Sequence, residues 1–258
     1  MLTFRNTAVV YVLLILGLMT YDYSHELSIW YYVVPFVAVS LLVAWGSYFI
    51  RSGFFLKAFC DGDKNKSQVA ITFDDGPHEQ TPLILDVLKK NNAKAAFFCI
   101  GKNFRGKEEI VKRIAEEGHL VGNHSFSHSN FFDFFSVKKL LEDVSKTDAL
   151  ILQTIGKKNR LFRPPFGVTT PNISQMVAKN KYLVMGWNVR SYDTSIKDRG
   201  KLLHRVLTRM QNGSVILLHD STPGMDEILQ KVLDHAKAKN LNVVSLEEMF
   251  AIKAYEPV

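Results

Sequence analysis

Two pairs of side chains in this chain have the types and the spacing of a metal site. Asp74 and Asp75 are adjacent, and His124 and His128 are four residues apart. On one helical turn the two imidazoles would project to the same side, about 6 Å apart. Two histidines and one carboxylate leave positions open on a divalent cation, which catalysis needs for water and substrate. Each pair alone is weak evidence, because an Asp-rich turn and a chance H-x-x-x-H are both common.

Two further polar groups follow apolar runs. Arg163 begins the sequence Arg-Pro-Pro-Phe-Gly, and His219 ends an apolar run from Val215. An arginine there could hold a carboxylate with two parallel hydrogen bonds, and a histidine could transfer a proton near neutral pH. The alternatives are a structural turn with a surface ion pair and a hydrogen-bonded core histidine.

Strand-like and helix-like segments alternate from Gln68 onward. The strand-like runs are Val69–Phe73, Ala95–Ile100, His119–Gly122, Leu161–Arg163, Tyr182–Trp187, Val215–His219 and Leu241–Val244. The helix-like stretches are Thr81–Asn91, Lys107–Glu117, Val137–Ile155, Pro171–Lys179, Lys201–Met210 and Met225–Ala238. This alternation predicts an α/β fold with a parallel sheet, closed or nearly closed into a (β/α) barrel of about seven strands. The four polar segments would then meet at the C-terminal ends of the strands, where such folds place their active sites.

Together these segments resemble the polysaccharide deacetylase family, that is, the NodB-homology domain of carbohydrate esterase family four. The matching motifs are TFDDGP (72–77), HSFSH (124–128), RPPFG (163–167) and LLH (217–219), and the resemblance covers roughly residues 66–252. It implies a distorted (β/α) barrel. It also implies hydrolytic removal of N-acetyl groups from GlcNAc-type units of a polysaccharide or a lipid-linked glycan.

The resemblance further implies the roles of individual residues. Asp75, His124 and His128 would bind a divalent metal, most often Zn²⁺, with Co²⁺ or another divalent ion as alternatives. Asp74 would be the general base and His219 the general acid.

The other matching positions would support these groups. Arg163 would orient the catalytic aspartate. On the substrate side, Pro165 and Phe166 lie in the RPPFG loop, where the backbone N–H of Phe166 would stabilise an oxyanion. Leu217 would line the pocket for the acetyl methyl group.

One family motif, usually D-x-x-D-W, departs from its pattern. Here Arg190 occupies the first acidic position and Thr194 replaces the tryptophan, while Asp193 remains. Either Asp193 supports His219, or the acid is tuned differently. An unneutralised Arg190 near His219 would lower the pKa of the imidazole.

The N-terminal part of the chain reads as a membrane anchor. Ala8–Met19 is apolar but short for a bilayer, and Leu27–Ile50 is uncharged and long enough, with aromatic residues toward its ends. We predict a hairpin of two transmembrane helices in residues 1–52, a linker in 53–66 and a catalytic domain in 67–252. A signal peptide is less favoured, because no A-x-A pattern follows the first run.

Basic residues flank the hairpin on one side only. Arg5 precedes the first span, the connecting loop has no Lys or Arg, and the second span is followed by Arg51, Lys57, Lys64 and Lys66. The positive-inside rule therefore predicts a multi-pass protein with its catalytic domain in the cytoplasm. The resemblance instead implies an extracytoplasmic domain, unless the substrate is a lipid-linked precursor on the cytoplasmic face.

The composition limits the other function classes. The formal net charge is +7, but no run of five Lys or Arg residues occurs, which argues against a nucleic-acid partner. Cys60 and Cys99 are not expected to form a disulfide. The aromatic stretch 131–135 is expected to anchor a loop or core, with sugar stacking or membrane contact as the less favoured reading. Alternatives to an N-deacetylase are the same metal site acting on an O-acetyl ester or a non-sugar amide, and a non-catalytic membrane-tethered carbohydrate-binding domain.

Overall fold

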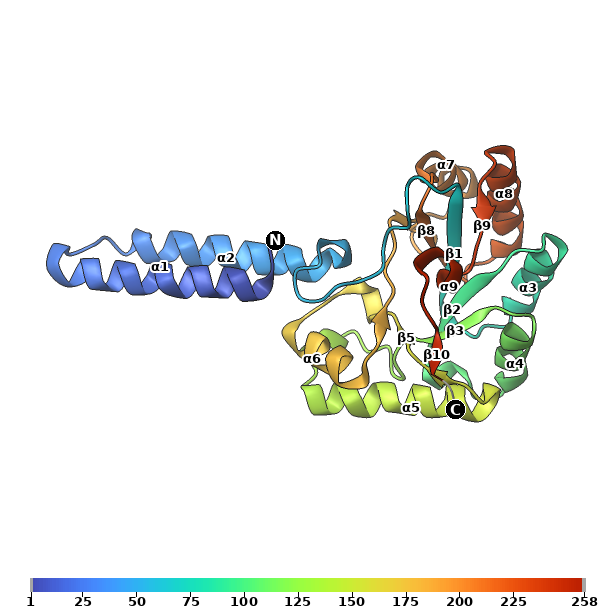
Figure 1. Cartoon of the computed structure of the whole chain (residues 1–258), viewed down its shortest axis with the longest axis horizontal. Helices are drawn as coiled ribbons and strands as arrows, with labels where there is room; N and C mark the ends of the chain where they lie inside the picture. The colour runs from blue at the N-terminus through green and yellow to red at the C-terminus, as the bar shows by residue number, and fades with distance from the viewer. Residues whose placement is uncertain (1, 257–258) are drawn as a thin grey trace.

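The computed structural model describes residues 2–256 and consists of an α/β domain with a helical hairpin projecting from it (Figure 1). The helices are α1 (Phe4–His25), α2 (Trp30–Tyr48), α3 (Thr81–Lys90), α4 (Glu108–Glu116), α5 (Val137–Ile155), α6 (Pro171–Asn180), α7 (Arg199–Arg209), α8 (Met225–Ala238) and α9 (Leu246–Phe250). The strands are β1 (Gln68–Gly76), β2 (Ala95–Cys99), β3 (Leu120–Asn123), β4 (Lys158–Asn159), β5 (Leu161–Phe162), β6 (Leu183–Val184), β7 (Val189–Arg190), β8 (Ser214–His219), β9 (Asn242–Val243) and β10 (Tyr255–Glu256).

The main sheet is parallel and curled, as predicted for a distorted (β/α) barrel. Its strand order is β6-β5-β3-β2-β1-β8-β7, and β9 also pairs with β1. Residues before β1 lie at the opening between the two ends of this row. Phe59 pairs with Met185 just after β6, and Asp61 pairs with Ser214 of β8. A short segment of the stretch between hairpin and β1 therefore helps to close the barrel.

The two faces of β1 bury different kinds of side chain. Val69, Ile71 and Phe73 pack into the cluster formed with α3, α4, α7 and α8, which cover the outside of the sheet. Ala70 points the other way, into a second cluster that fills the barrel and includes Leu246 of α9. Since side chains alternate along a strand, Thr72 and Asp74 follow Ala70 on the inner side, toward the C-terminal end of the strand.

The hairpin helices expose their apolar side chains. Within α1 no residue is buried, and within α2 only Gly46 is. Both helices are long and apolar enough to cross a membrane by length and composition. Their 22 and 19 residues correspond to about 33 and 29 Å at 1.5 Å per residue, close to the hydrocarbon thickness of a bilayer.

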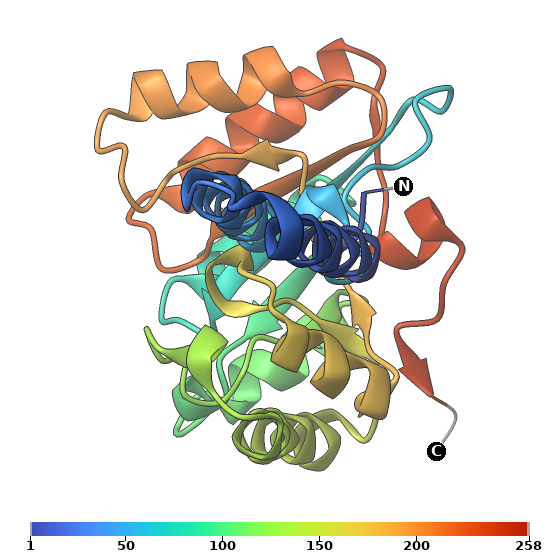
Figure 2. The same ribbon diagram turned by 90° about the vertical axis from the view of Figure 1, so that its left-hand side faces the viewer.

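The base of the hairpin is bonded to the α/β domain. The backbone N–H of Thr169, just after the RPPFG loop, donates to the carbonyl of Ser47 in α2 (3.0 Å), and Phe4 N–H donates to the carbonyl of Phe54 (2.9 Å). Gly46 is needed at this contact, because a Cβ there would lie 2.2 Å from the Phe54 ring. Figure 2 views the hairpin along its length, in front of the barrel.

The structure departs from the sequence predictions in several short elements, among them the helix α9, which was not predicted. The run predicted as one strand over 182–187 is the two-residue β6, and β7, which pairs with β8, was not predicted. The short antiparallel pair β4–β10 was also missed. Apart from these, the six predicted helices are present with ends shifted by at most two residues. Cys60 and Cys99 are free, buried thiols.

Candidate active site

Parallel pairing brings the predicted residues to one end of the barrel. Asp74 of β1 lies opposite His219 of β8. Asn123, which ends β3, lies opposite Phe162 of β5, so the next residues, His124 and Arg163, leave the sheet at the same edge. The C-terminal ends of β1, β3, β5 and β8 thus supply the four motifs, as the barrel rule predicts.

Asp75, His124 and His128 form a group that could hold a metal ion. The Nε2 atoms of His124 and His128 lie 3.5 and 3.4 Å from the same oxygen, Oδ1 of Asp75. All three candidate ligand atoms lie within 4.8 Å of one another. A tetrahedral ion with ligand bonds of about 2.0–2.1 Å holds its ligand atoms roughly 3.4 Å apart.

The surroundings of these three residues fit a cation. Asp75 Oδ1 is buried and has no hydrogen-bond partner among the described residues. The Nδ1–H of His124 donates to the carbonyl of Arg163 (2.8 Å), which leaves Nε2 as the free lone pair. Burial, with the nearby His128, lowers the pKa of His124 to about 3, so this imidazole is neutral. A neutral, oriented imidazole facing an unsatisfied carboxylate oxygen is what a metal ligand requires.

The loop carrying the histidines is not the helical turn that their spacing suggested. Ser125 and His128 have positive φ values of 64° and 44°. Phe126 N–H donates to Asp143 Oδ1 (2.7 Å), from α5, and His128 N–H donates to Ser125 Oγ (3.0 Å). Side-chain acceptors thus replace the carbonyls of a helix, which corrects the prediction. The imidazoles still converge, with ring centroids 4.9 Å apart.

Asp74 is held apart from the metal group by a buried arginine. Arg163 is fully buried; its Nη1 donates to Asp74 Oδ1 (2.7 Å) and to Thr72 Oγ1 (2.9 Å). Its Nε and Nη2 donate to the carbonyls of Met185 and Gly186. The guanidinium fixes one oxygen of Asp74, while Oδ2 lies 3.7 Å from His124 Nε2. This carboxylate is therefore oriented by the guanidinium and directed at the same space as the metal ligands.

His219 faces this space from the opposite side and is bonded to Asp193. Its Nδ1–H and its backbone N–H each donate to a different oxygen of Asp193, both at 2.7 Å. Burial lowers the pKa of His219, but the hydrogen bond and charge of Asp193, with Asp74 and Asp75, outweigh it and raise the pKa to about 9. Nε2 lies 4.0 Å from Asp75 Oδ2. The imidazole is thus protonated at neutral pH and directed at the site.

A cavity of about 260 Å³ connects these groups. It is lined by Asp74, Asp75, His124, His128, Phe166, Gly167, Trp187, Arg190, Tyr192, Thr194, Leu217 and His219. Phe166, at φ +59°, packs edge-on against His128 (4.8 Å), and its backbone N–H donates no hydrogen bond within the described chain. Leu217 is buried in the cavity wall, whereas Pro165 is buried in the same turn as Phe166 but does not line the cavity.

The comparisons with known proteins agree with this geometry. Residues 61–185 match the model of the polysaccharide deacetylase family. A peptidoglycan-N-acetylglucosamine deacetylase of Bacillus cereus is 38% identical over 200 residues, which cover 73% of this chain and 70% of the relative. The chain belongs to the polysaccharide deacetylase family. It spans only 40% of the length of two other curated relatives.

Solved structures of family members share the fold. The Bc1960 peptidoglycan N-acetylglucosamine deacetylase, solved with a hydroxamate-type benzamide, superposes with a TM-score of 0.72 at 34% identity, over 76% of this chain and 94% of that one. The wild-type BA3943 protein of Bacillus anthracis, described as a pseudoenzyme of carbohydrate esterase family four, gives a TM-score of 0.69 at 27% identity, over 74% of this chain and 67% of that one. Family membership alone therefore does not establish activity, which depends on the residues at the site.

Arg190, the departure from the family pattern, does not contact the acid. Its guanidinium lies over the rings of Trp187 (5.5 Å) and Tyr192 (4.9 Å). Asp193 bonds to His219 and forms no ion pair with Arg190 in the described residues. Trp187 and Tyr192 line the cavity but were not proposed from the sequence. The sequence offered one signal for both residues. They lie in the stretch around the family motif that departs from its pattern, between two strands that end at the active-site edge.

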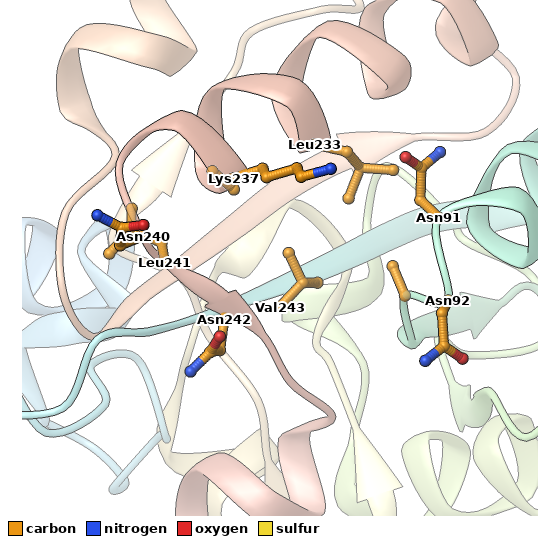
Figure 3. Close-up of a pocket in the computed structure, with 10 residues that line it drawn as sticks. Asn91, Asn92, Leu233, Lys237, Asn240, Leu241, Asn242 and Val243 are labelled. Carbon is orange, nitrogen blue, oxygen red and sulfur yellow. The ribbon is translucent and has the colours of Figure 1, made fainter.

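A second cavity, of about 420 Å³, lies at the other end of the barrel (Figure 3). It is formed by Asn91 and Asn92, which precede β2, by Leu233 and Lys237 of α8, and by residues 240–243. Lys237 is its one titratable side chain, and no carboxylate or imidazole of this family's motifs reaches it. This cavity is therefore not the active site.

Proposed function

We propose that this protein is a membrane-anchored, divalent-metal-dependent hydrolase that removes N-acetyl groups from an N-acetylated glycan. The observation that carries the proposal is the separation of the two adjacent aspartates: Asp75 faces the Nε2 atoms of His124 and His128, while Asp74 is held by Arg163. The Bacillus cereus relative named above is a peptidoglycan-N-acetylglucosamine deacetylase. We therefore propose GlcNAc-type units as the substrate class, and Zn²⁺ as the ion.

The residues that would activate the attacking water and those that would protonate the leaving amine lie on two sides of the cavity. When bound by Asp75, His124 and His128, a divalent cation would supply Lewis acidity that lowers the pKa of water and polarises the acetyl carbonyl. Asp74 accepts the proton of the attacking water, and Arg163 keeps its carboxylate oriented toward the cavity. Phe166 lines the cavity, and its backbone N–H, which has no partner within the described chain, would stabilise the charge that develops on the carbonyl oxygen.

The opposite wall serves the leaving group. His219 is protonated at neutral pH and donates a proton to the departing amine nitrogen, which is a poor leaving group without it. Asp193 is a positioning residue that holds the imidazole through Nδ1 and keeps its acid form populated. Leu217 and Trp187 supply an apolar wall suited to an acetyl methyl group.

The test is acetate release from chitooligosaccharide by the purified full-length chain. We expect activity that a chelator abolishes and Zn²⁺ restores. Asp74→Asn should lower kcat by 10²-fold or more, the order expected for loss of a general base, while retaining bound metal. Asp234→Asn, which changes an exposed carboxylate of α8, should match the wild type.

Three outcomes separate the alternatives. Equal turnover by Asp74→Asn would refute the assigned base. Acetate release from an acetyl ester but not from chitooligosaccharide would indicate an esterase with the same site. Sugar binding without acetate release from either substrate would indicate a non-catalytic carbohydrate-binding domain, as in a pseudoenzyme.

A further inference from the structure

A third, smaller cavity adjoins the active site on the side of the hairpin. Its volume is about 190 Å³, and it lies between the end of α2 and α7. We call it the arginine pocket and define it by Arg190, Arg205 and Arg209, with Tyr48 and Phe49 at the end of α2. It shares Trp187, Arg190 and Tyr192 with the catalytic cavity, so these three residues form a wall that the two cavities have in common.

The positive charge in the arginine pocket is not neutralised. Arg51, at the rim, is paired with Asp61, but Arg190, Arg205 and Arg209 form no ion pair within residues 2–256. Arg205 is fixed by its Nε–H, which donates to the carbonyl of Arg190 (3.0 Å), and by the Tyr192 ring 4.4 Å beneath it. Three guanidinium groups without carboxylates in one concave site favour an anion with several oxygens, such as a phosphate.

The position of the pocket indicates where that anion comes from. Tyr48 and Phe49 end the second apolar helix and are half exposed, as aromatic residues at a membrane interface are. The pocket therefore lies between the expected membrane surface and the catalytic cavity. A ligand with its sugar at His219 and its lipid in the bilayer would place the group that joins them here.

We propose that the arginine pocket binds the phosphate or diphosphate that links the glycan substrate to a membrane lipid. This inference rests on the proposed function, because it assigns the lipid-linked form of the same substrate. The proposal also gives a role to Arg190, the residue that departs from the family motif. Arg190 lies on the wall shared by the two cavities and does not contact His219.

Binding can be measured without turnover, by native mass spectrometry of the full-length chain in neutral detergent. The probe is farnesyl phosphate, and phosphatidylglycerol serves as a second anionic lipid with a different structure. We expect selective retention of farnesyl phosphate. Arg209→Gln and the double variant Arg205→Gln/Arg209→Gln should weaken it at least about tenfold, the loss expected when one charge-assisted hydrogen bond is removed. The matched control is Lys201→Gln/Lys231→Gln, which removes two exposed charges outside the pocket.

Kinetics then show whether the site serves the substrate. We expect both arginine variants to lower kcat/KM for an N-acetylglucosaminyl farnesyl diphosphate at least about tenfold more than kcat/KM for phosphate-free chitooligosaccharide. Equal loss on both substrates would overturn the assignment, as would equal retention of phosphatidylglycerol and farnesyl phosphate. Because lipid retention needs no catalysis, an inactive protein that still binds farnesyl phosphate would contradict the proposed function and not the arginine pocket.

Discussion

At the scale of single residues, the acid side of the site depends on the contact between Asp193 and His219. Burial alone would lower the pKa of this imidazole, and the carboxylate of Asp193 reverses the shift, raising the pKa to about 9. Because we propose His219 as the general acid, which must be protonated to act, activity should fall as the pH rises through that pKa. In Asp193→Asn, burial still lowers the pKa of His219, while the charge of Asp193 that raises it is lost. We therefore expect the alkaline limb of the kcat/KM profile to move to lower pH.

The measurement is the pH profile of acetate release by wild type and Asp193→Asn. Asp193→Glu, which keeps the charge, should restore part of the shift. The same contact affects stability, because the pKa of His219 is higher in the folded chain than in the unfolded chain. The stabilisation from the protonated imidazole is fully present below the unfolded pKa of 6.5 and is lost as the pH rises through about 9. The variant should thus differ most from wild type in unfolding temperature at acid pH. An alkaline limb that stays in place would show that Asp193 does not set the acid.

The sequence predicted some of these residues for a physical reason and missed others. Asp74, Asp75 and His219 directly end apolar strands, so the barrel rule alone places them at one edge. Trp187 and Tyr192 lie in the segment around the two-residue β7, where no periodicity is long enough to show which way a side chain points. Their place in the cavity follows from the pairing of β7 with β8, which the sequence pattern does not encode.

At the scale of elements, the RPPFG turn illustrates how backbone conformation positions the site. Gly167 has φ +72°, and a Cβ there would lie 2.4 Å from the Trp187 ring. Gly156, after α5, has φ +65° and open space around it. Both Gly→Ala changes strain the backbone by about 1 kcal/mol, but only the first forces Trp187, which lines the catalytic cavity, to shift.

We therefore expect Gly167→Ala to lower acetate release at least tenfold, well beyond its effect on the unfolding temperature. Gly156→Ala should cost a similar amount of stability from strain while leaving kcat/KM near the wild-type value. Both are checked by thermal unfolding and by kinetics on chitooligosaccharide. Similar kinetics for the two variants would mean that the position of Trp187 does not matter for catalysis.

The elements also show where sequence patterns suffice. The helices were predicted closely because their apolar faces repeat over two turns or more, and features such as Pro171 at the start of α6 mark their ends. The histidine loop was predicted wrongly, because its shape depends on Asp143, a residue of α5 far along the chain. Spacing alone favours a helix there, and the distant carboxylate decides otherwise.

At the scale of the whole molecule, the contact between the hairpin and the α/β domain relates the site to the expected membrane surface. The hydrogen bond between Thr169 and Ser47 joins the segment after the RPPFG turn to α2, so a hairpin inserted in a bilayer would hold the cavity near the membrane surface. Such an arrangement suits a substrate attached to the bilayer better than a distant polymer. The arginine pocket, between α2 and the catalytic cavity, follows the same geometry.

The side of the membrane is the remaining prediction at this scale. Arg5 lies in the first turn of α1, basic residues follow α2, and the turn between the helices has none, so the charge rule predicts both ends and the catalytic domain in the cytoplasm. A green fluorescent protein fused to the C-terminus should then fluoresce in a bacterial host, while an alkaline phosphatase fusion should be inactive. Replacing Lys57, Lys64 and Lys66 by Gln should weaken this preference, because it removes three of the charges that follow α2. The opposite pattern, active phosphatase and a dark fluorescent fusion, would place the domain outside and favour a wall polymer over a cytoplasmic lipid-linked precursor.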